Sequence, residues 1–211
     1  MTENSAWLRQ VLSYEYFCDK LFHKNSYFYF SALKGNALEI SSGSGQHVVH
    51  FAHHFSDITW QPSDYNSDNF GSINAYIEDS QLPNVKPPVI LDVTEPKTWQ
   101  NATLDINSVD AIFNANMVHI APIECTYGLF KVASSLLHKG GLLIMYGPFA
   151  VEGVLTPDSN VHFDQVLRSR DPSFGIRDTA LLKRCAEENA LSLTDTIEMP
   201  ANNKILIFVK L

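Results

Sequence analysis

Residues Ala37-Leu38-Glu39-Ile40-Ser41-Ser42-Gly43-Ser44-Gly45-Gln46-His47 decide how this chain is interpreted. They read as a short apolar strand, a turn of small residues and a helix that opens near Gln46. The glycines at 43 and 45 can take positive φ and carry no Cβ, so the backbone can approach a ligand closely. The following helix offers free N–H groups and a partial positive charge at its N-terminus. The stretch predicts a site for a nucleotide-like ligand, with a purely structural turn as the alternative.

Two ligand classes use such a turn, and two positions separate them. A dinucleotide fingerprint needs a small residue at position 48, so that helix and strand pack tightly around a pyrophosphate. This chain has Val48 there, and its acid, Glu39, stands at the end of the strand before the glycines. A nicotinamide-dependent oxidoreductase is therefore a disfavoured alternative.

Composition limits the classes of partner. The chain has 211 residues, 45% of them hydrophobic, which fits one globular domain. The formal charge of −8, with no run of Lys or Arg, disfavours nucleic acid. Cys18, Cys125 and Cys185 are odd in number and far apart, so we expect buried thiols and neither disulfides nor a cysteine zinc site.

The hydropathy pattern indicates where the protein resides. No apolar run approaches the roughly 20 residues of a membrane span, and the polar residues 1–5 do not resemble a secretory signal. We expect a soluble, cytoplasmic protein that acts on a small molecule and contacts no membrane. The sequence does not indicate an oligomeric state.

Strands and helices alternate along the chain. Helical patterns follow Gln46, span 67–80, begin near Pro122 and begin again at Asp178. The expected strands cover residues 37–40, 58–64, 87–94, 108–119, 142–146, 191–199 and 204–211. This order predicts an α/β fold with a doubly wound, mostly parallel seven-stranded sheet and a C-terminal antiparallel hairpin.

Three successive strands end on acids, namely Glu39, Asp64 and Asp92. Asp64 stands 19 residues after Gly45, the spacing at which a doubly wound fold brings a carboxylate to ribose hydroxyls. Asp64 could instead cap the helix at 67–80. Capping alone explains three such acids poorly.

His47, His50 and His54 share a stripe of the helix after the glycine turn. The stretch lacks an H-E-x-x-H pattern and a carboxylate on that face, so we predict no metal site there.

Two segments lie outside the regular alternation. Residues 1–36 form an N-terminal extension with a helical stripe over 6–22 and aromatic residues at 27–30, which would pack on the core or cover the site. Residues 147–177 are a polar, charged insertion after the fifth strand, where ligands bind in such folds. The insertion would build a substrate pocket or form a surface network of Arg and Asp. We assign 37–211 to one cofactor-binding domain.

An acid followed by small-x-Gly-x-Gly resembles the first motif of class I S-adenosylmethionine (SAM)-dependent methyltransferases, and Ser41 stands where many members carry glycine. Over about residues 37 to 210 the chain is similar to a small, poorly characterised methyltransferase-like branch of that superfamily. The blocks that carry the resemblance are Glu39–His47, Trp60–Ser63, Asn116–Ile120, Tyr146–Phe149, Arg170–Pro172 and Glu198–Asn203.

The resemblance implies SAM as cofactor and a role for each matching residue. Glu39, Ser41, Gly43 and Gly45 would form the turn that holds its methionine end. Asp64 would bind the ribose, and Asp92 with Val93 would bind the adenine.

Asn114 and Asn116 would face the transferred methyl group. The Asn116-Met117-Val118-His119 stretch differs from the Asn/Asp-Pro-Pro-aromatic signature of methyltransferases that act on amino groups of bases or glutamine. His119 is the candidate base, because imidazole changes charge near neutral pH, with a structural histidine as the alternative. Tyr146 is a second candidate. The expected reaction is methyl transfer to an O, N or S atom, and a non-catalytic protein with the same fold is the rival.

Overall fold

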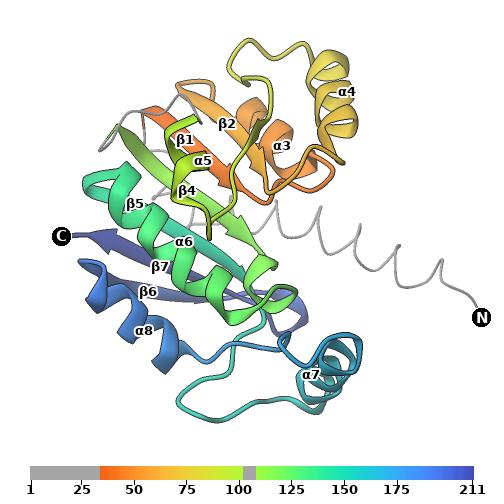
Figure 1. The fold of residues 1–211 in the computed structure, drawn as a ribbon, viewed down its shortest axis with the longest axis vertical. Coiled ribbons are helices and arrows are strands. Elements are labelled where there is room, and N and C mark those ends of the chain that lie inside the picture. Colours follow the sequence, from red (N-terminus) through yellow and green to blue (C-terminus); the bar gives the residue numbers. More distant parts are fainter. Residues whose placement is uncertain (1–33, 102–107) are drawn as a thin grey trace, which may run out of the picture.

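The computed structural model describes residues 34–101 and 108–211, and these form one seven-stranded sheet with helices on both faces (Figure 1). The order across the sheet is β3-β2-β1-β4-β5-β7-β6. The strands are β1 (Gly35–Ile40), β2 (Ile58–Asp64), β3 (Val89–Ile90), β4 (Val109–Ala115), β5 (Leu137–Gly147), β6 (Leu191–Glu198) and β7 (Lys204–Lys210). Strands β1 to β5 pair in parallel, and β7 runs antiparallel to both β5 and β6. The predicted fold class is confirmed.

The helices connect the parallel strands and cover the sheet. They are α3 (Gln46–His54), α4 (Phe70–Ser80), α5 (Pro96–Asn101), α6 (Ile123–Leu136), α7 (Asp158–Arg170) and α8 (Thr179–Glu188), with short 3-10 turns η1 (Met117–His119) and η2 (Pro200–Asn202). Within the described ranges no helix combines the length and the apolar character that a membrane crossing requires.

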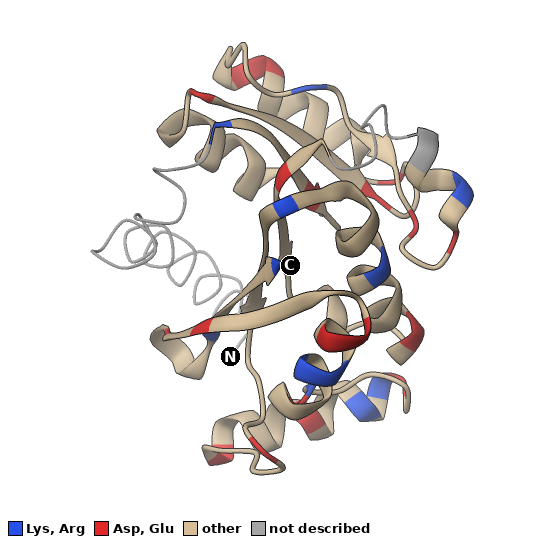
Figure 2. Ribbon diagram, turned by 90° about the vertical axis from the view of Figure 1, so that its left-hand side faces the viewer, with Lys and Arg blue, Asp and Glu red and all other residues tan. Residues whose placement is uncertain are grey.

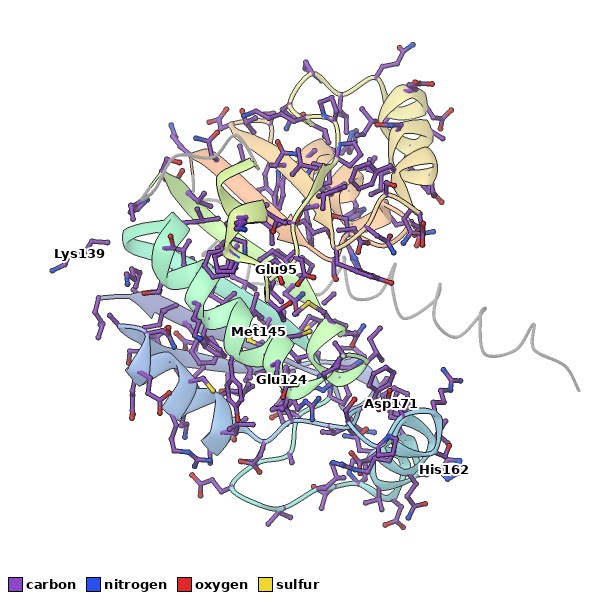
Figure 3. All side chains as sticks on the ribbon, viewed as in Figure 1. Glu95, Glu124, Lys139, Met145, His162 and Asp171 are labelled. Carbon is purple, nitrogen blue, oxygen red and sulfur yellow. The ribbon has the colours of Figure 1, made fainter. Side chains whose placement is uncertain are left out.

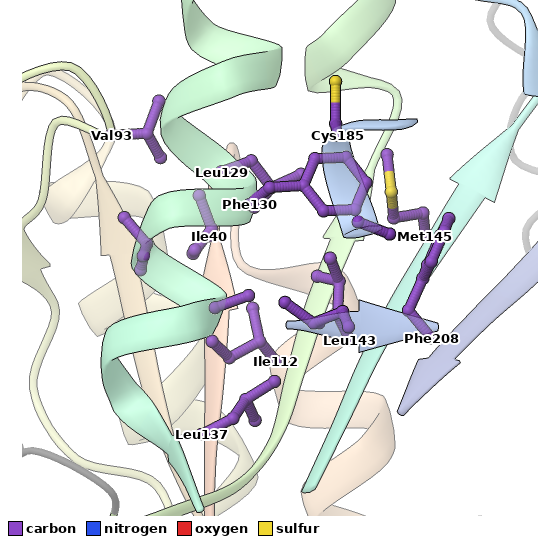
Figure 4. Packing of buried hydrophobic residues seen from close by; sticks show 14 of the residues in the cluster. Ile40, Val93, Ile112, Leu129, Phe130, Leu137, Leu143, Met145, Cys185 and Phe208 are labelled. Carbon is purple, nitrogen blue, oxygen red and sulfur yellow. The ribbon is translucent and has the colours of Figure 1, made fainter. Parts of the chain in front are cut away.

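Alternation along the central strands produces two apolar cores, one on each face. On β5, Leu143 and Met145 pack with buried residues of α6 and α8 (Figure 4). Ile144 belongs to the opposite core, which contains Phe51 of α3 and Trp60 of β2. Because β1, β4 and β5 are covered on both faces, their side chains are almost wholly buried, as parallel strands require.

Several predicted boundaries need correction. The strand expected over 87–94 is reduced to Val89–Ile90, because Asp92 Oδ1 accepts the Thr94 backbone N–H at 2.8 Å and turns the chain. Helix α4 begins at Phe70 rather than at 67, and β5 begins at Leu137 rather than at 142.

Helix α7 lies inside the insertion, where no helix was expected. Of its thirteen residues only Asn160 and Leu167 are buried, so it has no apolar stripe for periodicity to detect. In Figure 3 His162 of α7 and the following Asp171 lie at the opposite end of the strands from Lys139 of β5. The insertion thus stands at the carboxyl edge of the sheet. The helix and the aromatic cluster expected before residue 34 lie outside the described residues.

Candidate functional site

A pocket of about 510 Å³ opens at the carboxyl ends of β1 to β4, in the size range of small-molecule sites. Of the predicted site residues, Ser41, Gly43, Asp64, Asp92 and Val93 line it. Its other lining residues are Ile40, Tyr65, Asn69, Leu91, Thr94, Ala115, Met117, Ile120, Ala121, Pro122, Cys125 and Phe174.

The turn after β1 forms the floor of the pocket. Ser41, Gly43 and Gly45 have φ of 59°, 54° and 93°, so the turn uses the left-handed region three times. A Cβ on Gly45 would lie 3.0 Å from the Ile73 Cα, whereas a Cβ on Gly43 would meet nothing within 4 Å. Gly45 is therefore needed for helix packing, and Gly43 leaves its backbone open to the pocket.

Asp64, at the end of β2, is tied to this turn. Its Oδ2 accepts the Gly43 N–H at 3.2 Å, and its Oδ1 accepts the Tyr65 N–H at 2.8 Å. Helix α4 is preceded by Asn69 in the N-cap position, so Asp64 does not cap that helix. The carboxylate is 4% exposed, lines the pocket and retains lone pairs for a ligand hydroxyl.

Glu39 lies beneath the turn and is 1% exposed. Burial raises its pKa to about 8, nearby Asp64 adds to the rise, and the Ser42 side chain and Val48 N–H oppose it. His47 Nδ1 lies 3.6 Å from Oε1, and burial lowers the pKa of His47 to about 4, with His50 adding to the fall. Both groups are thus mainly uncharged at neutral pH. Glu39 Oε2 has no hydrogen-bond partner among the described residues.

Asp92 and Val93 form the wall beyond β3. The Asp92 Oδ1 accepts both the N–H and the hydroxyl of Thr94, at 2.8 and 2.7 Å. A Cβ on Gly128 of α6 would collide with the Val93 carbonyl oxygen. Gly128 therefore lets α6 pack against this wall. The sequence carried that signal, since a glycine inside a helical pattern often marks close packing.

Asn114 and Asn116 flank the end of β4. Asn114 is 1% exposed and its Nδ2 donates to the Ile40 carbonyl at 2.9 Å, while its Oδ1 has no partner among the described residues. Asn116 has φ of 60° and opens the η1 turn. Neither side chain lines the pocket, although Ala115 between them does.

His119 is buried behind the pocket rather than exposed in it. It is 1% exposed, and burial, aided by the positive charge of Arg177, lowers its pKa to about 3. Its Nδ1 faces the Arg177 backbone N–H at 3.4 Å, and its ring contacts Phe149 edge-on at 5.0 Å. A Cβ on Gly147 would lie 2.6 Å from its Nε2. This packing favours a structural histidine.

Tyr146 also lies away from the pocket. It belongs to the core on the α3 side of the sheet, and its hydroxyl accepts from Asn203 Nδ2 at 2.7 Å. The structure thus brings together the three strand-end acids and the turn, but it does not bring the two candidate bases into the pocket.

Residues 171–177, which we call the 171–177 arm, contribute a wall of the pocket. They belong to the insertion 147–177 that was expected to build a substrate pocket or a surface network, although neither Phe174 nor Arg177 was singled out. The Gly175 N–H donates to the His119 carbonyl at 2.9 Å, and Phe174 lines the pocket. Arg177 is 8% exposed and donates to the carbonyls of Val118, Ala121 and Ser173 at 2.7, 2.7 and 2.9 Å. These contacts fix the arm to the chain after β4.

The described ranges contain no group of three or more His, Cys, Asp or Glu side chains arranged to hold a metal ion. Along α3, His54 Nδ1 lies 2.9 Å from the His50 carbonyl oxygen, and the two rings are 4.4 Å apart.

One family model matches most of the chain. The family model described as "Protein of unknown function (DUF938)" matches residues 27–210. The chain belongs to this family, whose description assigns no activity.

Solved structures of methyltransferases share the fold. An O-methyltransferase family protein from Burkholderia thailandensis superposes with a TM-score of 0.76 at 12% identity, over 92% of this chain and 55% of that one. CalO1, a methyltransferase of calicheamicin biosynthesis solved with S-adenosylhomocysteine (SAH), gives 0.72 at 13%, over 97% and 55%. The geranyl diphosphate C-methyltransferase of Streptomyces coelicolor, solved with SAH, gives 0.65 at 10%, over 84% and 70%. The chain spans about half the length of the first of these proteins. At identities of 10 to 13%, the superpositions show a shared fold and nothing further.

Proposed function

We propose that this protein is a SAM-dependent methyltransferase that acts on a small molecule. The observation that carries the proposal is the link between the glycine turn and Asp64. One buried carboxylate at the end of β2 accepts a backbone N–H of the turn and faces the same pocket. A dinucleotide site remains disfavoured, because it requires a small residue at position 48. Val48 stands there and is fully buried in the core on the α3 side.

The residues present fit SAM. Asp64 would accept hydrogen bonds from the ribose hydroxyls, and Asp92 would accept one from the adenine amino group beside the apolar Val93. The exposed backbone at Gly43 would approach the methionine part. Glu39 and Asn114 do not line the pocket, and Glu39 Oε2 and Asn114 Oδ1 are buried without partners among the described residues, so we propose that these two residues support the turn rather than contact SAM.

SAM supplies a methyl group on a positively charged sulfur, which an O, N or S atom attacks as the carbon–sulfur bond breaks. The chain's own contribution is alignment of the two reactants and exclusion of water. The pocket supports this role, because its turn, its acids and its walls are fixed by backbone hydrogen bonds and buried packing.

The assignment of a base stays a prediction. A histidine with a pKa near 3 is a weak proton acceptor, and the Nδ1 of His119 already faces an N–H. We therefore propose that His119 supports the chain after β4, and that an acceptor requiring deprotonation loses its proton to a group other than His119.

The test is conversion of SAM to SAH, measured by mass spectrometry, with the small-molecule fraction of cells that produce the protein as the source of acceptor. We expect wild type to form SAH and Asp64→Ala to form less than about a tenth as much. Asp79→Ala, at an exposed position of α4, is the matched control and should equal wild type. SAM binding without SAH formation would favour the rival, a non-catalytic SAM-binding protein.

A further inference from the structure

The 171–177 arm is held rigidly at the pocket. Beyond the contacts of Gly175 and Arg177, the Ile176 N–H donates to Asp164 Oδ1 at 2.7 Å, and the Phe174 N–H donates to the Asp171 carbonyl at 3.0 Å. Gly175 has φ of 142°, and a Cβ there would lie 2.7 Å from Asp164 Oδ1. These contacts fix the backbone on both sides of Phe174.

The arm closes one end of the pocket. Asp64 is the last residue of β2 and Asp92 follows β3, on one side of β1 in the sheet. The arm is bound to residues 118–121, which follow β4 on the other side of β1. The lining side chains at this second end are apolar, namely Met117, Ile120, Ala121 and Phe174. Ile120 is 52% exposed, so its side chain is accessible to a ligand at the rim of the pocket.

The charges around the pocket have one sign. Asp64 and Asp92 line it, and none of its described lining residues is Lys or Arg. Arg177, the cation of the arm, and Arg168 of the preceding helix α7 are already engaged, and the exposed Arg170 of α7 does not line the pocket. Arg168 Nε donates to Asp164 at 2.7 Å, and Arg177 donates to three carbonyls. Over residues 34–101 and 108–211, Figure 2 shows Lys and Arg distributed among Asp and Glu rather than collected in one basic patch. At the end formed by the arm, a phosphate, sulfonate or carboxylate group would therefore meet no cationic side chain among the described lining residues.

We propose that Phe174 and Ile120 form the acceptor subsite, and that its ligand is an uncharged apolar or aromatic small molecule packed on the Phe174 ring. The inference rests on the proposed function, because the acids and the glycine turn are assigned to SAM and this apolar end remains for the acceptor. Phe174 is thus a specificity-determining residue.

The experiment compares two dyes that differ by one sulfonate, N-phenyl-1-naphthylamine and 8-anilinonaphthalene-1-sulfonate. Each is titrated by fluorescence into full-length protein saturated with SAH, after calorimetry has confirmed that SAH binds. We expect the neutral dye to bind at least about tenfold more tightly than the sulfonated one, a difference of about 1.4 kcal/mol. Phe174→Ala should weaken the neutral dye about tenfold, and Phe174→Leu should weaken it less.

Phe163→Ala is the matched control, because Phe163 is 41% exposed on α7 and does not line the pocket. It should leave the affinity for both dyes unchanged, and SAH affinity should be the same in all variants. The inference is overturned if SAH binds but neither dye does, if the sulfonated dye binds as tightly as the neutral one, or if Phe174→Ala equals wild type. Failure of SAH itself to bind would instead refute the proposed function.

Discussion

The two ends of the pocket are built by different means. At the end formed by β1 to β3, short segments act locally. They are a turn with three left-handed residues and acids at or close to the ends of strands. At the other end, the chain after β4 is held by an arm about 55 residues further along, through Arg177 and Gly175. The first end contains the polar atoms that we propose for SAM. The second provides an apolar wall whose composition can change without altering the first.

Replacement of Arg177, which holds the arm to the chain after β4, should have the largest effect on stability. Arg177→Met would leave three carbonyls, including those of Val118 and Ala121, without a charged donor, so we expect a loss of about 3–5 kcal/mol in the free energy of unfolding. The exposed Arg170→Met is the control and should change it by less than about 0.5 kcal/mol. Urea unfolding followed by circular dichroism measures both. Equal stability of the two variants would show that the arm does not depend on Arg177.

Gly128 connects α6 to the wall formed by Val93. Gly128→Ala places a methyl group against the Val93 carbonyl, so we expect a loss of about 1–3 kcal/mol and weaker SAM binding, although alanine favours helix.

The matched variant is Gly71→Ala on α4, where a Cβ meets nothing within 4 Å. It should gain up to about 1 kcal/mol. Thermal unfolding with and without SAM compares the two. A stabilised Gly128→Ala protein would mean that α6 can shift freely away from Val93.

Glu39 should make stability depend on pH. Its folded-state pKa of about 8 exceeds the ordinary value of 4.5, so the folded protein binds more protons than the unfolded chain between those values. The contribution of Glu39 to the free energy of unfolding should therefore fall as pH rises from about 4.5 to about 8, by up to about 1.4 kcal/mol per pH unit. His47 and His119, whose pKa values are lowered, act in the opposite direction below about pH 6.5, so the Glu39 contribution is read as the difference in slope between wild type and Glu39→Gln. Glu39→Gln should remove that contribution, and exposed Glu95→Gln should keep it. Urea unfolding at pH 5, 6, 7 and 8 measures the free energy of unfolding of each protein. The same dependence on pH in wild type and Glu39→Gln would contradict a raised pKa for Glu39.

Ser41 provides the smallest expected effect. Because it holds φ of 59°, Ser41→Gly should relieve strain and stabilise the protein by about 0.5–1 kcal/mol. Ser44→Gly, in the same turn but outside the left-handed region, should be neutral or destabilising. Thermal unfolding measures both, and a loss of stability in Ser41→Gly would refute the strain argument.

The difference between the two ends of the pocket explains which parts of the site could be predicted from the sequence. Glu39, Asp64 and Asp92 were predictable because the ends of parallel strands meet at one edge, so position in the chain fixes position in space. Phe174 and Arg177 were not, because their contacts depend on where a polar insertion folds back. Helix α7 has almost no buried face, and periodicity therefore could not detect it. The two candidate bases were chosen by residue type, which does not indicate the face or depth at which a side chain lies.

The most direct test of the central claim is calorimetric titration of the full-length protein with SAH, in wild type and in Asp64→Asn. We expect one site per chain with micromolar affinity in wild type. We expect a loss of about a hundredfold in Asp64→Asn, because a ribose would lose charge-assisted hydrogen bonds. Circular dichroism should confirm that the variant remains folded. Absence of SAH binding to wild type, or equal affinity in the two proteins, would contradict the assignment of this pocket to SAM.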